Sequence, residues 1–147
     1  MVVLATLTGW SNINGTGKSL NNQIQGNLGT NVLTGGGGAD TFVFTGPNSA
    51  LLPFDTIADF SRVTGGRDFI DLTAIDANSL VAGDQAFTLI GDLSLNPFSG
   101  AGQLGYLVFS SISKIRVIGE IDGIDLGGDF AVDLNLTGSM GSSDFLL

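Results

Sequence analysis

The sequence contains no cysteine and no histidine, and it carries five basic residues against fourteen acidic ones. Without a thiol or an imidazole, the chain cannot build a cysteine nucleophile, a Ser-His-Asp triad or the usual zinc and copper sites. The scarcity of lysine and arginine removes the basic surface that nucleic-acid binding requires. Every apolar run is shorter than a membrane span. We therefore expect no nucleic acid as a partner and no membrane-spanning segment.

Glutamate is also nearly absent, because thirteen of the fourteen acids are aspartate and the other is Glu120. Glutamate favours helices, whereas aspartate suits turns and metal sites built from oxygen ligands. Glycine is abundant, with 23 copies in 147 residues, roughly twice the average usage of about 7%. This composition predicts a turn-rich β protein with a net charge of −9.

The first ten residues, MVVLATLTGW, lack the positively charged start and the full apolar stretch of a secretory signal peptide. A hydrophobic content of 43% is enough for a packed core. We expect one domain over residues 1–147, cut from a larger protein.

A nine-residue pattern repeats in residues 26–34 and 35–43, and residues 17–25 fit it more loosely. Apolar residues recur nine positions apart at Ile24, Leu33 and Phe42. Two positions before each of them stands a polar residue: Asn22, Asn31 and Asp40. The copy GGGGADTFV matches G-G-x-G-x-D-x-U-x, the calcium-binding nonapeptide of RTX proteins. Such repeats form a parallel β-roll in which two repeats make one coil.

This repeat predicts a calcium site at the turn formed by residues 35–40. Glycine allows positive φ and a close approach of backbone carbonyls to a cation, as at Gly36 and Gly38. The Asp40 turn should stack on the Asn22 turn on one side and on a turn near Asp59 on the other, and carboxylate and carbonyl oxygens are the ligands that Ca²⁺ prefers. In the earlier copies asparagine replaces aspartate, which keeps an oxygen ligand, as at Asn22, but loses its charge, so we expect one or two ions. Glycine-rich turns without metal remain the alternative.

The rest of the chain predicts further strands. Apolar and polar residues alternate, as in half-buried strands, in residues 54–60, 67–72, 87–90, 104–109, 112–118 and 130–136. Gly65 and Gly66 form a turn, and residues 73–80 suit one short helical turn. The predicted fold is all-β: a short parallel β-roll over residues 1–46 that runs into an antiparallel, β-sandwich-like part over residues 47–147.

Three acidic or glycine-rich segments offer competing interpretations. The stretch GTGKS at residues 15–19 lacks the first glycine of a P-loop, since Asn12 stands there, and no helical pattern follows it. The loop at residues 120–129 could hold calcium or form an Asp-Gly hairpin turn. Asp55 and Asp59, four residues apart on one expected strand, face the same way and suit a cation better than an acid–base pair.

Several segments in order resemble the C-terminal region of serralysin-type metalloproteases. They are residues 33–44, 55–60, 68–72, 98–104, 129–134 and 143–147. The resemblance implies a calcium-binding RTX module, with the glycine carbonyls and Asp40 as ligands and with Asp59, together with Asp55 or Asp68, closing the last site. It also implies an uncleaved signal at residues 140–147, ending in Asp144–Leu147, that engages the type I secretion machinery.

The resemblance therefore implies a secreted, extracellular module without catalytic activity of its own. The H-E-x-x-H motif of the protease is absent from the sequence, so an N-terminal catalytic domain would belong to the parent chain. Similar modules also follow lipases, alginate epimerases and adhesins. A polysaccharide-binding module, as in alginate epimerases, is the alternative function, although five bases supply little positive charge for binding a polyanion.

Overall fold

The structure, a computed structural model, describes residues 3–46, 54–124 and 128–147. Short β-strands dominate these residues, with two 3₁₀ turns, η2 (Ser110–Ile112) and η3 (Ser142–Asp144). The strands are β1 (Val3–Thr6), β2 (Gly15–Thr16), β3 (Asn22–Gln25), β4 (Val32–Thr34), β5 (Thr41–Val43), β6 (Asp55–Ile57), β7 (Phe69–Asp71), β8 (Thr88–Asp92), β9 (Gln103–Phe109), β10 (Lys114–Glu120), β11 (Phe130–Leu134) and β12 (Phe145–Leu146). None of the helices in the described part of the chain has the length and apolarity of a membrane span.

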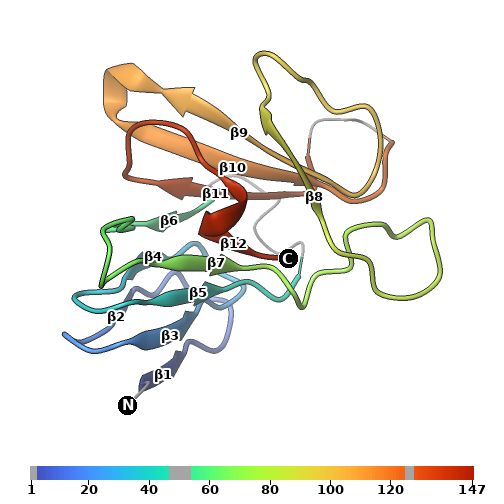
Figure 1. The fold of residues 1–147 in the computed structure, drawn as a ribbon. Coiled ribbons are helices and arrows are strands. Elements are labelled where there is room, and N and C mark those ends of the chain that lie inside the picture. Colours follow the sequence, from blue (N-terminus) through green and yellow to red (C-terminus); the bar gives the residue numbers. More distant parts are fainter. Residues whose placement is uncertain (1–2, 47–53, 125–127) are drawn as a thin grey trace.

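Successive strands of the first half alternate between two sheets, which makes the chain a parallel roll. One sheet has the order β1-β3-β5-β7-β12 and the other begins with β2-β4-β6. Gln23 pairs with Thr41 and Gly15 with Leu33, so each strand lies beside the strand two repeats away. Figure 1 shows these strands stacked from β1 at the N-terminal end of the molecule. The predicted β-roll is confirmed.

The antiparallel part continues the second sheet of the roll. Strand β11 pairs in parallel with β6, and β10 and β9 then follow with antiparallel pairing. Strand β8 is the last strand, at the edge of the sheet. The predicted all-β fold with a parallel and an antiparallel part is therefore confirmed. The C-terminal strand β12 returns to the roll and pairs with β7 (Figure 1).

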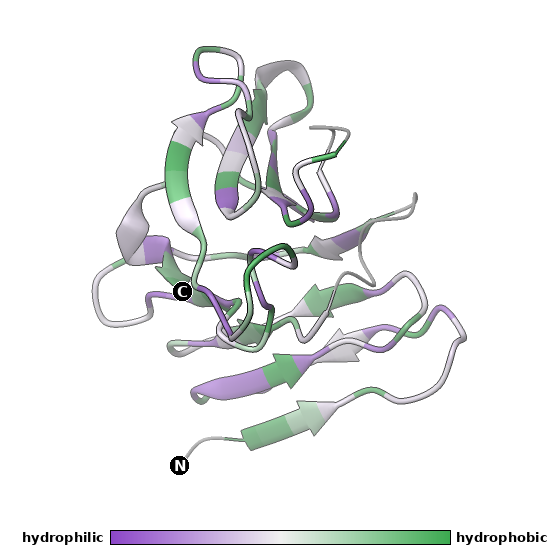
Figure 2. Cartoon of the chain, turned by 90° about the vertical axis from the view of Figure 1, so that its right-hand side faces the viewer, coloured by the Kyte–Doolittle hydropathy of each residue, from purple (hydrophilic) through white to green (hydrophobic). Residues whose placement is uncertain are grey.

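The core lies between the two sheets and is built from the inward residue of each short strand. Ile24, Leu33 and Phe42, the apolar positions of the repeat, are fully buried. Strands this short can each bury one large side chain, because alternate residues point to opposite faces. Figure 2 shows the resulting alternation of hydrophobic and hydrophilic segments along the stacked strands.

Two local predictions are wrong. Residues 73–80 form turns without a helix, because the carboxylates of Asp71 and Asp76 accept hydrogen bonds from backbone N–H groups two residues later and compete with helical bonding. Asp55 and Asp59 do not face the same way, because strand β6 ends at Ile57 and Asp59 lies in the turn that follows.

Candidate metal sites

The connections between the two sheets form two rows of turns, one at each edge of the roll. We call the connections that lead from the second sheet to the first, residues 17–21, 35–40, 58–68 and 135–144, the first row. The second row includes residues 7–14 and 26–31. Since the strands stack in register, the turns of each row stack as well, and each pair of neighbouring turns forms an interface.

Glycine is required in turn 35–40 by both conformation and space. Gly36 has φ of 92° and Gly38 has φ of 107°, which is the left-handed region that glycine tolerates. A Cβ at Gly38 would lie 2.6 Å from the backbone carbon of Leu20 in the preceding turn. The glycines of the repeat therefore allow turns 17–21 and 35–40 to approach each other closely.

Asp40 lies at the centre of the first row. The backbone N–H of Asn22 donates to Asp40 Oδ1 at 2.7 Å, and the backbone N–H of Asp40 donates to Asp68 Oδ1 at 2.8 Å. Asn22, Asp40 and Asp68 thus form one aligned series across three turns. Asp40 is 1% exposed, and its second oxygen, Oδ2, is buried without a hydrogen-bond partner among the described residues.

Two more carboxylates adjoin turn 35–40 from the next turn of the row. Asp59 accepts hydrogen bonds from the backbone N–H groups of Gly35 and Gly36, both at 2.8 Å. Asp68 accepts from the backbone N–H of Asp40 and of Ser61, also at 2.8 Å. The pKa of Asp68 is raised to about 6, mainly by burial: the two N–H donors lower it, and the charges of Asp40 and Asp59 add to the rise.

The structure separates the predicted ligands into the two rows. Asn22, Asp40 and Asp59 lie in or beside the first row, and Gly36 and Gly38 lie in the same turn as Asp40. Asp55 lies at the second row, where its Oδ1 accepts the backbone N–H of Asn31 at 2.8 Å. This bond repeats the one from the Asn22 N–H to Asp40 Oδ1. The two rows therefore share a hydrogen-bond pattern, but Asp55 does not belong to the same site as Asp40.

Another acidic cluster lies at the loop between β10 and β11. Glu120, Asp122 and Asp129 each offer a carboxylate oxygen, and these oxygens lie within 4.8 Å of one another. Glu120 accepts from the backbone N–H of Gly123 at 2.8 Å, and Asp129 accepts from Asp122 at 3.1 Å. The acidic side chains of this loop therefore stabilise its own backbone through hydrogen bonds. Residues 125–127 of the same loop lie outside the described part.

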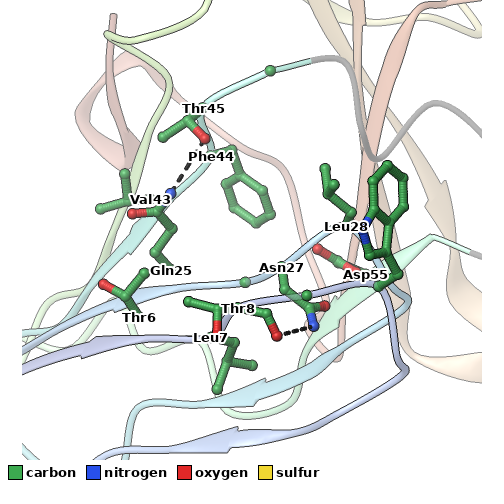
Figure 3. Close-up of a pocket in the computed structure, with 14 residues that line it drawn as sticks. Thr6, Leu7, Thr8, Gln25, Asn27, Leu28, Val43, Phe44, Thr45 and Asp55 are labelled. Atoms are coloured by element: carbon green, nitrogen blue, oxygen red, sulfur yellow. Dashed lines mark hydrogen bonds between the residues drawn. The ribbon is translucent and has the colours of Figure 1, made fainter.

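A pocket of about 370 Å³ lies at the second row of turns (Figure 3). Trp10, which is 82% exposed, contributes to its lining. Two polar side chains of the pocket form hydrogen bonds within the protein: Gln25 Nε2 donates to Thr45 Oγ1 and Asn27 Nδ2 donates to the Thr8 carbonyl, both at 3.2 Å. Among the described residues that line it there is no lysine or arginine, and Asp55 is acidic, so the pocket offers no positive charge to a polyanion.

Two arginines hold the C-terminal segment against the roll. Arg67 Nη2 lies 2.5 Å from Asp144 Oδ1, and Arg62 Nη2 donates to the Thr137 carbonyl at 2.8 Å. Asp144 is buried, and its Oδ2 accepts the backbone N–H of Gly141 at 2.9 Å. Turn 58–68 therefore contacts turn 35–40 on one side and turn 135–144 on the other.

The comparison with known proteins agrees with this architecture. The family described as Peptidase M10 serralysin C terminal matches residues 6–146. No curated protein matches the chain. The match covers almost the whole sequence, including the roll from the end of β1, the antiparallel strands and β12. The chain belongs to the serralysin C-terminal family of the M10 peptidases.

Proposed function

We propose that this chain is a calcium-folded, non-catalytic C-terminal module of a secreted peptidase that serves type I export, folding and stability. The observation that carries the proposal is Asp40 Oδ2, a buried carboxylate oxygen without a hydrogen-bond partner among the described residues. A buried, unpaired carboxylate is costly unless a cation neutralises it.

The turn that carries this oxygen offers further ligands for a calcium ion. Asp59 and Asp68 bring two more carboxylates against the same turn, and Gly36 and Gly38 have the positive φ of the repeat's glycine turn. Ca²⁺ takes six to eight oxygen ligands in flexible geometry, from carboxylates and backbone carbonyls alike. The ligands we assign to this first-row site are Asp40, Asp59, Asp68 and the carbonyls of turn 35–40.

Calcium would couple export to folding. The net charge of −9 opposes compaction until a divalent cation binds. Because the ligands come together in the folded chain, the free energy of calcium binding becomes free energy of folding. Where calcium is scarce the chain would stay unfolded and able to cross a secretion channel, and outside the cell it would fold.

The C-terminal segment fits this order of events. Asp144 and Phe145 are buried, and β12 pairs with β7. An export signal in Asp144–Leu147 would therefore be accessible before folding and partly buried afterwards, with Leu146 still exposed.

Binding of an acidic polysaccharide is less well supported. Four of the five bases form ion pairs within the fold, Arg62 and Arg67 with Asp144 and Lys114 and Arg116 with Asp133. These pairs leave little positive charge for a polyanion.

Isothermal titration with calcium tests the proposal on the wild-type chain and on Asp40→Asn. This change keeps the shape of the side chain but removes its charge, and we expect calcium affinity to fall by about tenfold or more, because ligand charge sets the affinity of such sites. Asp84→Asn makes the same chemical change at an exposed position and should leave the affinity unchanged. Equal affinities for Asp40→Asn and the wild type would contradict the assigned site.

A further inference from the structure

The side chain of Asn22 lies at the interface between turns 17–21 and 35–40 and is buried, with 2% of its surface exposed. Its amide nitrogen, Nδ2, is surrounded by four oxygens. It donates to the carbonyls of Lys18 at 2.9 Å and Gly35 at 3.1 Å, to Asp40 Oδ1 at 2.7 Å, and to the carbonyl of Leu20 at shorter range. Three carbonyls and one carboxylate oxygen thus point at one atom.

The hydrogen bonds of the turn fix which end of the amide faces these oxygens. Asn22 Oδ1 accepts the backbone N–H of Lys18 at 3.2 Å. Reversing the amide would place Oδ1 among four other oxygens and would leave the Lys18 N–H facing an NH₂ group. A primary amide has only two hydrogens, so it cannot satisfy all four acceptors fully. Carbonyl and carboxylate oxygens gathered around one point are instead the ligands that a calcium ion prefers.

We propose that the Asn22 amide takes the place of a cation between turns 17–21 and 35–40, so that this interface assembles without metal and Asn22 confines calcium to the next interface of the row. The inference rests on the proposed function only in naming calcium as the ion at that next interface. Asn22 is in this sense a residue that determines where the roll binds metal.

A second asparagine repeats the arrangement in the other row. Asn31 Oδ1 accepts the backbone N–H of Asn27, four residues earlier, as Asn22 Oδ1 accepts that of Lys18. Asn31 Nδ2 donates to the Ile13 carbonyl at 2.7 Å in the preceding turn. The same side chain at the same repeat position therefore links neighbouring turns through N–H donors in both rows.

The variant Asn22→Asp tests the proposal, because it replaces the NH₂ donor by an oxygen and adds a negative charge. We expect this variant to bind one more calcium ion per chain than the wild type in native mass spectrometry and calorimetry. In a calcium titration this variant should need more calcium than the wild type to fold, because two carboxylates and three carbonyls would face one another until the additional cation binds.

Asn21→Asp is the matched control. Asn21 lies in the same turn and is exposed, and its Oδ1 already accepts the Ala39 N–H at 3.0 Å, so the variant gains the same charge outside the oxygen cluster. It should keep the wild-type calcium stoichiometry. If Asn22→Asp binds no more calcium than Asn21→Asp, the proposal is wrong.

A measurement on the wild-type chain covers the case in which Asn22→Asp does not fold. In the calcium-saturated protein, the side-chain NH₂ protons of Asn22 should exchange with solvent far more slowly than those of exposed Asn21, as followed by NMR. Equal exchange rates would overturn the proposal. A wild-type chain that binds no calcium, together with an Asn22→Asp variant that binds one ion, would instead refute the proposed function and leave this inference standing.

Discussion

The buried carboxylate of Asp68 links the proposed calcium site to pH. Burial raises its pKa from 3.8 to about 6 in the metal-free chain. Because the folded state then binds a proton more tightly than the unfolded state, Asp68 contributes stability below pH 3.8, and this contribution is lost as the pH rises through about 6. The protonated carboxylate thus favours the metal-free folded state, whereas calcium binding requires the ionised carboxylate.

Calcium affinity should therefore fall as the pH drops below about 6. Calorimetric titrations one pH unit above and one below this value measure the effect. Asp68→Asn should bind calcium more weakly and should lose most of the dependence on pH in this window. A wild-type affinity that stays constant across the window would remove Asp68 from the site.

At the scale of the turn, two adjacent glycines in residues 35–40 carry different constraints. Gly38 has φ of 107° and no room for a Cβ, whereas a Cβ at Gly37 would make ordinary contacts at 3.6 Å with Ser19. Gly38→Ala should lower the free energy of unfolding in calcium by about 1–3 kcal/mol, the cost of a strained backbone conformation. Gly37→Ala should change it far less. Chemical denaturation of both variants compares them, and equal losses would contradict the turn geometry.

The contact between turn 58–68 and the C-terminal segment is a second test at this scale. Arg67→Ala removes the partner of Asp144 Oδ1, and leaving that buried oxygen unsatisfied should cost about 1–3 kcal/mol. Hydrogen exchange should speed up at the Leu72 N–H, which donates to the Leu146 carbonyl of β12. Lys18→Ala, which removes an exposed base from turn 17–21, should not change exchange at Leu72. An unchanged rate at Leu72 in Arg67→Ala would show that Arg67 does not hold β12.

The roll itself could be predicted from the sequence, because its repeat places Ile24, Leu33 and Phe42 at a fixed spacing and all three are buried. Asp40 could be singled out for the same reason. Strand β12 could not, since two residues give no periodic signal and its partner β7 lies far away in sequence. The separation of Asp55 from Asp59 also depends on where β6 ends, which alternation alone does not fix.

The role of the Asn22 amide was also beyond the sequence. The substitution of asparagine for aspartate predicts an oxygen ligand without charge, but the direction of the amide depends on the Lys18 N–H that fixes its Oδ1. Likewise, the segment 61–67 gives no sign that its arginines reach residues 137–144, which lie more than seventy positions later. These contacts are set by the stacking of the turns.

At the scale of the whole molecule, the first row of turns has three successive interfaces. The first is bridged by the Asn22 amide, the second brings Asp40, Asp59 and Asp68 together, and the third is bridged by Arg62 and Arg67. Side-chain nitrogen donors thus face the oxygens of the outer two interfaces, whereas the carboxylates of the middle interface accept from backbone N–H groups. We therefore place metal dependence at the middle interface.

The location of β12 leads to a prediction for export. Deleting Asp144–Leu147 should abolish or sharply reduce type I secretion of a fused passenger, as measured by its extracellular fraction. Arg67→Ala weakens the docking of the same segment but leaves it in the chain, so it should still be exported. Undiminished secretion of the truncated chain would place the signal elsewhere, and loss of export in Arg67→Ala alone would mean that docking, not the signal, is required.

Calcium binding at the first row, we propose, drives the folding of this chain. The test is far-UV circular dichroism of the purified chain, first in chelator and then during a calcium titration. We predict a largely unfolded spectrum in chelator and a cooperative gain of β structure at millimolar calcium, with Asp40→Asn requiring more calcium than the wild type. A chain that is fully folded in chelator and gains nothing from calcium would show that calcium does not drive its folding.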